Sequence, residues 1–185
     1  MSTPEQRKKM GAHIVDFEAR RDENGRVRVY KLPVEDGGGA YEVAGINDKY
    51  QPETAARLRS LVEAGKQQQA EEEAADYIIQ YTDRVADWTQ SAAVECYLRD
   101  SAFNRGAGGA AKILQIAVGV GVDGGVGPIT KEAVAEAEKN PGALLDSLRA
   151  ARETYERDHI GFREIFWQGL TNRWNKAHAF AKTFL

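Results

Sequence analysis

Apolar positions near the start of the chain repeat with the period of a helix. Met10, Ile14 and Phe17 are spaced by four and three residues, which places them on one face of a helix. Thr3 followed by Pro4 is typical of a helix start, because proline is favoured at the first helical position. The pattern predicts a helix that runs from there to about residue 20.

A short alternating segment follows this helix and is the only β signal of the chain. Val27 and Val29 alternate with charged residues, as expected for a half-buried strand. A glycine-rich loop over residues 33–39 comes next, and residues 40–46 again favour a strand. The two strands predict one small β-hairpin near the N-terminus.

The remaining pattern is helical. Helices are expected over residues 52–65, 66–85, 91–104, 109–119, 128–137, 141–158 and 162–184, with a break at the glycines of residues 106–109 and a possible break at Gly169. Apolar residues recur at helical spacing in these segments. The sequence therefore predicts a mainly α fold in which the hairpin is the exception.

Composition and charge exclude several classes of protein. Of the 185 residues, 42% are hydrophobic and 29% are charged, which is ordinary for a globular domain. The net charge of −3, with both signs mixed along the chain, argues against a nucleic-acid-binding surface or a polybasic membrane anchor. Cys96 is the only cysteine, and the three histidines are widely spaced, so we expect no disulfide within the chain, no metal site and no cofactor.

No stretch of the sequence reads as a signal peptide or a membrane span. The first ten residues are polar, and no apolar run of signal-peptide length follows them. The most apolar stretch, residues 110–122, is interrupted by polar residues and is too short to cross a bilayer. We therefore expect a protein that is made in the cytoplasm without a signal peptide and does not insert into membranes.

A carboxyl group stands where the predicted helix meets the hairpin. Glu18 directly follows the apolar Phe17, and partial desolvation of a carboxyl group suits it to act as a general acid. Glycoside hydrolysis needs such a proton donor, together with a second carboxylate or an oriented water. Candidates for the second carboxylate are Glu35, Asp36, Glu42 and Asp48. A glutamate in the last turn of a helix is more often a solvated surface residue, so its position alone does not decide.

Five segments match the motif order of one family. Residues 18–21 (EARR) stand at its E-G-G-Y motif, and residues 36–39 (DGGG) with 44–46 (AGI) stand at its D-P-G-G-x-T-N-Y-G-I motif. Residues 100–106 (DSAFNRG), 111–115 with 122–130 (AKILQ, VDGGVGPIT) and 166–174 (FWQGLTNRW) resemble D-x-A-x-N-x-G, W-L-Q with D-G-x-x-G-P-x-T, and F-x-x-G-W-x-N-R. Over about residues 13–176 the chain thus resembles glycoside hydrolase family 108, which contains lysozyme-like N-acetylmuramidases.

The resemblance implies a fold and a function. The fold is lysozyme-like, with a catalytic part that carries the hairpin in residues 1–90 and a helical, predicted peptidoglycan-binding part in residues 91–185, packed as one globule. The function is that of an endolysin-like muramidase from a phage or prophage, which cleaves the β-1,4 glycosidic bonds of peptidoglycan after release or export. Its partner is the glycan strand.

The resemblance also assigns roles to residues. Glu18 is the general acid, and Glu42 or Asp36 is the second catalytic group. The substrate-binding set is Tyr41, Asp48, Asp100 and Asn104. The last two lie four residues apart and share a helix face. That face borders the cleft in this interpretation, whereas a polar pair that satisfies the helix end near residue 106 is the alternative.

Departures from the family motif leave other functions open. Ala19 and Arg20 replace the two glycines after the glutamate, and the threonine of the second motif has no clean counterpart, with Tyr41 or Glu42 nearest. We favour an active muramidase, because the glutamate keeps its place. The alternatives are a hydrolase with a shifted substrate, an inactive wall-binding or phage-structural protein that retains the fold, and a helical adaptor that binds a protein partner.

Overall fold

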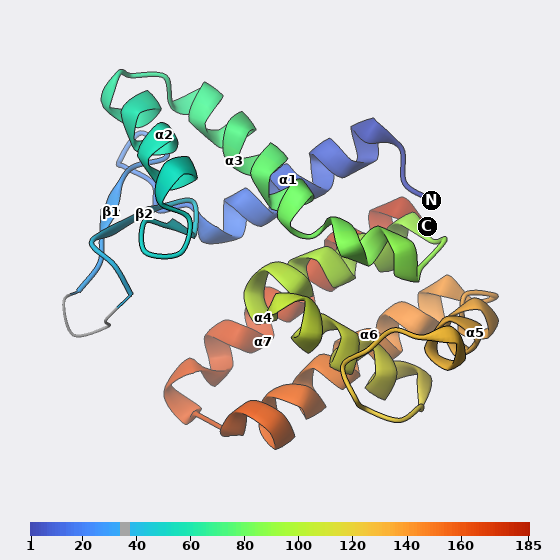
Figure 1. Cartoon of the computed structure of the whole chain (residues 1–185). Coiled ribbons are helices and arrows are strands. Elements are labelled where there is room, and N and C mark those ends of the chain that lie inside the picture. Colours follow the sequence, from blue (N-terminus) through green and yellow to red (C-terminus); the bar gives the residue numbers. More distant parts are fainter. Residues whose placement is uncertain (34–37) are drawn as a thin grey trace. The chain divides into compact units, whose positions relative to one another are not determined.

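The computed structural model describes residues 1–33 and 38–185, and the chain divides into two compact units (Figure 1). One unit consists of residues 8–80. The other combines residues 1–7 with residues 81–185. The functional division at residue 90 that the family resemblance implies stays a prediction.

Helices dominate the described residues, and a small sheet lies near the N-terminus. The helices are α1 (Pro4–Glu18), α2 (Pro52–Glu63), α3 (Gln67–Tyr81), α4 (Ala92–Val118), α5 (Pro128–Ala137), α6 (Pro141–Tyr155) and α7 (Glu164–Ala181), with 3-10 helices at Asp83–Trp88 and Lys182–Phe184 and a π-helical turn at Glu156–Gly161. The strands are β1 (Tyr30–Lys31), β2 (Tyr41–Val43) and β3 (Ile46–Asn47). The predicted mainly α architecture is confirmed.

The sheet has one more strand than the sequence predicted. Its order is β1-β2-β3, and both pairs are antiparallel. The segment read as one strand over residues 40–46 is itself a hairpin, in which Ala44 and Gly45 form a two-residue turn with φ values of 51° and 75°. Such turns need positive φ at both central positions. Alanine rarely adopts this conformation, which is why the pattern did not reveal the turn.

In the unit of residues 8–80, α1 packs against α3. The start of α1 is as predicted: Thr3 and Gln6 cap it by reciprocal backbone and side-chain hydrogen bonds of 2.8 and 3.2 Å. Ile14 is fully buried, and Gly11 allows α1 to approach α3, since a methyl group there would lie 2.7 Å from the carbonyl oxygen of Ala75. Helix α2 contacts β2 and β3. This packing fixes the end of α1 beside the sheet.

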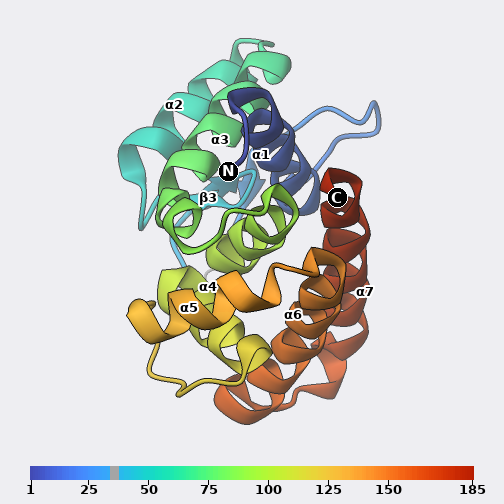
Figure 2. The same cartoon turned by 90° about the vertical axis from the view of Figure 1, so that its right-hand side faces the viewer.

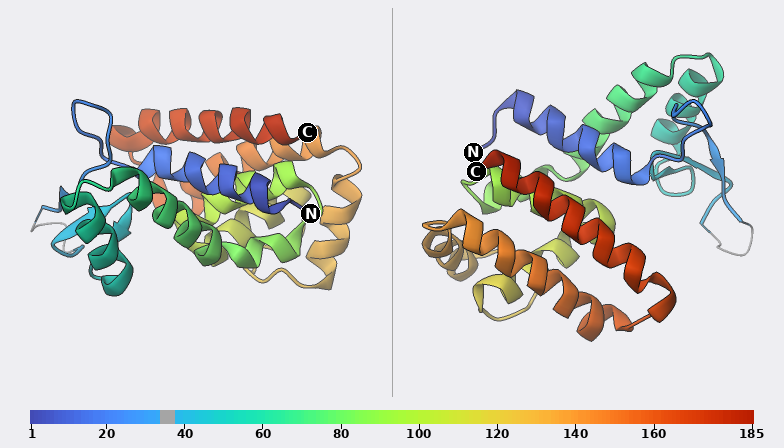
Figure 3. Two further views of the ribbon diagram at one scale, coloured as in Figure 1. Left: turned by 90° about the horizontal axis from the view of Figure 1, so that it is seen from above. Right: turned by 180° about the vertical axis from the view of Figure 1, so that it is seen from behind.

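The unit that contains residues 81–185 is built around α4. This helix contacts α5, α6 and α7 (Figure 2), and α7 lies alongside α6 (Figure 3). Gly106, with φ 71° and ψ 166°, kinks α4 where the sequence predicted a break. In contrast, α7 continues through Gly169, so the possible break there is not present.

The glycine-rich turn after α4 is tied to that helix by one side chain. Gln115 donates to the Asp123 carboxylate at 2.6 Å and accepts from the Gly124 amide at 2.8 Å. Gly124 has a φ of 82°, and Pro128 begins α5. These bonds agree with a structural role for the D-G-x-x-G-P segment. Across the described ranges, no helix combines the length and apolar character that a membrane crossing requires.

Candidate active site

Glu18 is the last residue of α1, and it packs against the turn between β2 and β3. A methyl group at Gly45 would lie 3.0 Å from both Oε2 and Cβ of Glu18. A larger residue would therefore push the carboxyl group aside. The two-residue turn, which also needs positive φ at this position, thus sets where the Glu18 side chain lies.

Glu42 brings a second carboxyl group to the same place. It lies on β2 opposite Tyr30 of β1 and Asn47 of β3, and its side chain is half-buried. Burial raises the pKa of Glu42, the charge of Glu18 raises it further, and Arg20 acts in the opposite direction. The effect of Glu18 on Glu42 indicates that the end of α1 and the sheet bring the two carboxyl groups within electrostatic range of each other.

Two further predicted residues shape the strand that carries Glu42. Oδ1 of Asp48 accepts hydrogen bonds from the backbone amides of Ala40 and Tyr41, at 2.9 and 3.2 Å. Asp48 therefore organises the hairpin. The Tyr41 ring is half-buried, and the guanidinium of Arg59 lies 5.0 Å from its centre.

Basic and aromatic side chains also meet on β1. The guanidinium carbons of Arg20 and Arg28 lie 5.1 and 5.7 Å from the centre of the Tyr30 ring, within the range of cation–π attraction. Arg20 thereby contacts β1 and also acts on the charge of Glu42. This neighbour of the site was not among the predicted residues, although its place two residues after Glu18 was a signal.

Comparison with solved structures identifies the architecture around this site. The chain is similar to the structure of Brucella abortus SagA, with a TM-score of 0.67 over 98% of this chain and 97% of that one, at 23% sequence identity. The fold is lysozyme-like. No family model matches the chain, and no curated protein matches it. The resemblance to glycoside hydrolase family 108 therefore stays a prediction.

The remaining catalytic candidate of this lysozyme-like fold is Asp36. It lies outside the described residues, as does Glu35. Among the described carboxyl groups proposed from the sequence, the charge of Glu18 raises the pKa of Glu42, and Asp48 is bound to the hairpin backbone. Within residues 1–33 and 38–185, no cluster of three or more histidine, cysteine, aspartate or glutamate residues has the geometry to hold a metal ion.

Asp100 is buried in ion pairs with two arginines. Its side chain is only 2% exposed, and its two oxygens accept from Arg152 at 2.5 Å and from Arg173 at 2.8 Å. Burial alone would raise the pKa of Asp100, but the two guanidinium groups outweigh it and lower the pKa to about 2. Two arginines close off this side chain, which favours a structural role for Asp100. The substrate contact that the resemblance implies stays a prediction.

Asn104 shares the helix face of Asp100, as predicted. Its Oδ1 lies 3.5 Å from the Arg152 guanidinium, which also binds Asp100. The pair thus faces a buried arginine of α6, in line with the alternative that these polar groups are satisfied within the protein. The sequence interpretation missed Arg152, because nothing in its local pattern distinguishes it from a surface arginine.

Proposed function

We propose that this protein hydrolyses the β-1,4 glycosidic bonds of peptidoglycan, with Glu18 and Glu42 as its catalytic carboxyl pair. The observation that carries the proposal is the interaction of these two groups between the end of α1 and the small sheet. The lysozyme-like fold supports it, and so does the motif order of the sequence.

The pair has the chemistry that the reaction requires. One carboxyl group must protonate the leaving oxygen, while an ionised group or a water that it orients acts at the anomeric carbon. Two carboxyl groups that repel each other do not both ionise easily, so Glu42 beside Glu18 keeps its proton to a higher pH than an ordinary glutamate does. In this assignment Glu18 donates the proton, and Glu42 stabilises the positive charge that develops on the sugar.

A specific observation favours the reverse division of roles. Burial and the charge of Glu18 raise the pKa of Glu42, and a carboxyl group with a raised pKa is the better proton donor near neutral pH. Glu42 is then the acid, and Glu18 is the ionised partner. Both assignments use the same pair, and they differ in how each variant responds to an activated substrate.

The test is hydrolysis of purified peptidoglycan by the wild type, Glu18→Gln and Glu42→Gln. Loss of a general acid or of its charged partner lowers the rate by about 100-fold or more, so we expect both variants to be nearly inactive. Glu53→Gln is the matched control, because Glu53 is an exposed glutamate of the same unit, and it should retain full activity.

The roles are separated by a second substrate, an aryl glycoside of N-acetylglucosamine oligomers with a leaving group that needs no protonation. The variant that lacks the proton donor should recover activity on it, and the variant that lacks the charged partner should not. A folded wild type that releases no sugar from peptidoglycan would contradict the proposal. Co-sedimentation with the wall material would then favour a wall-binding protein.

A further inference from the structure

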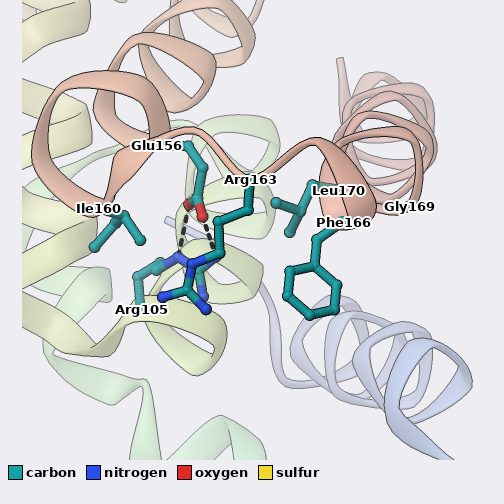
Figure 4. A pocket seen from close by; sticks show the side chains of 7 residues that line it. All are labelled: Arg105, Glu156, Ile160, Arg163, Phe166, Gly169 and Leu170. Carbon is teal, nitrogen blue, oxygen red and sulfur yellow. Dashed lines mark hydrogen bonds and ion pairs between the residues drawn. The ribbon is translucent and has the colours of Figure 1, made fainter.

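A second pocket lies in the other unit, between the π-helical turn and the N-terminal half of α7 (Figure 4). Its volume is about 360 Å³, at the lower end of the range for small-molecule sites. Ile160, Phe166 and Leu170 supply apolar walls. Ile160 and Phe166 are 41% and 52% exposed, so a ligand in the pocket would remove apolar surface from water.

Charged groups line the same pocket, and their balance is positive. Both oxygens of Glu156 accept from Arg105, at 2.8 and 2.9 Å. Arg163 also lines the pocket, and its side chain points toward that pair in Figure 4. Two arginines against one glutamate leave one positive charge. No side chain within residues 1–33 and 38–185 forms a hydrogen bond or ion pair with Arg163.

This combination selects the chemistry of the occupant. A guanidinium group binds a carboxylate through two parallel hydrogen bonds, and the apolar walls suit an aliphatic side chain. Glu156 can accept further hydrogen bonds. Each carboxylate oxygen has two acceptor sites, and each uses only one of these sites for Arg105. It can therefore accept the amide N–H that a terminal peptide residue carries beside its carboxylate.

We propose that the pocket binds the C-terminal end of a peptide whose last residue is aliphatic. The terminal carboxylate pairs with Arg163, the last amide N–H donates to Glu156, and the last side chain packs against Phe166 and Leu170, which lie next to each other in Figure 4. The site shares no residue with the carboxyl pair, which belongs to the other unit, and its test measures binding rather than hydrolysis. Its failure is thus distinguishable from failure of the proposed glycosidase activity.

Calorimetric titration of the full chain with N-acetyl-glycyl-leucine is the direct test. The comparison ligands are the same peptide with a C-terminal amide, which lacks the carboxylate, and hexanoate, which lacks the peptide N–H. A lost hydrogen bond to a charged group weakens binding by about tenfold or more, so both should bind at least that much more weakly. Equal binding of the amide, or hexanoate binding as tightly as the peptide, overturns the assignment.

Two variants place the site on the protein. Arg163→Gln should weaken peptide binding by about tenfold or more, whereas Arg84→Gln, which removes the same charge from an exposed position of the same unit, should leave it unchanged. Gly169 lines the pocket, and a Cβ atom added there would meet no described atom within 4 Å. Gly169→Leu should thus fill the pocket and abolish binding while the helix is kept.

The matched control for the filled pocket is Gln168→Leu, which adds the same side chain to an exposed neighbouring position of α7. It should bind the peptide like the wild type. Far-ultraviolet circular dichroism checks that both leucine variants retain their helix content. Undetectable peptide binding by the wild type, or unchanged binding by folded Gly169→Leu, overturns the proposal.

Discussion

Asp100 and Glu42 are both carboxyl groups withdrawn from water, yet their pKa values move in opposite directions. Burial would raise the pKa of Asp100, but Arg152 and Arg173 lower it to about 2. Burial raises the pKa of Glu42, and its neighbour Glu18 adds to the effect. The sign of the neighbouring charge, and not burial, separates the two.

The difference assigns the two residues to different tasks. Asp100 remains an anion across the physiological range and joins α4 to α6 and α7 through its two arginines. Glu42 is held beside another carboxyl group, so it takes up a proton more readily than an ordinary glutamate. A fixed charge holds helices together, whereas a titrating one is suited to proton transfer.

The largest loss of stability is expected when the charge of the buried Asp100 is removed. Asp100→Asn removes the charge that compensates Arg152, which is itself 1% exposed. Removing one partner of a buried ion pair costs about 3–5 kcal/mol, so the urea midpoint of unfolding should fall steeply. Asp83→Asn is the control, because Asp83 also pairs with an arginine but is 64% exposed.

The control should lose less than about 1 kcal/mol, because the Asp83 carboxylate is exposed to solvent and the buried Arg99 keeps its other partner, Glu95. Equal losses in the two variants would mean that burial does not distinguish the two ion pairs. Asp100 would then no longer differ from an exposed carboxyl group in how strongly it stabilises the fold, and its contrast with Glu42 would not hold.

An intermediate loss of stability is expected from a substitution in the turn between β2 and β3, which contacts Glu18. Gly45→Ala must adopt a φ of 75° and place its methyl group 3.0 Å from Glu18 Oε2. Gly25→Ala is a matched control, since Gly25 has the same φ and a methyl group there would meet no described atom within 4 Å. The left-handed conformation costs alanine about 1–2 kcal/mol, which both variants should lose in urea denaturation.

Only Gly45→Ala should lose stability beyond that amount, and only this variant should lose peptidoglycan hydrolysis. The reason is that its methyl group displaces the Glu18 carboxyl. Identical behaviour of the two alanine variants would show that the turn does not position Glu18. Contacts other than those with the turn would then have to position the Glu18 carboxyl group.

The sequence predicted the helix and the β region around Glu18 better than it predicted the partners of Asp100, which lie far away along the chain. The helical spacing of Met10, Ile14 and Phe17 placed Glu18 near a helix end, and the alternation after it predicted the β region. The partners of Asp100 lie 52 and 73 residues away, and no local pattern shows which side chain a folded chain brings opposite another. A family motif therefore suggested a ligand contact where the structure has a buried ion pair.

The smallest change in stability is expected at Glu42, the carboxyl group that titrates. A carboxyl group whose pKa is raised by folding binds more protons in the folded state than in the unfolded state, so it destabilises the protein as pH rises through its folded pKa. Glu42→Gln removes this penalty. At pH 7 the variant should be more stable than the wild type, by less than about 1 kcal/mol because the half-exposed side chain is screened by solvent.

Below the ordinary glutamate pKa of 4.5, Glu42 is protonated in both the folded and the unfolded state, so the advantage should disappear. Urea denaturation at pH 7 and at about pH 3 measures this change, with Glu53→Gln as the exposed control that should show none. A stability gain of the same size at both pH values would mean that the gain comes from packing. A loss at pH 7 would show that the attraction of Arg20 outweighs burial and the charge of Glu18, and would make Glu42 a fixed anion like Asp100.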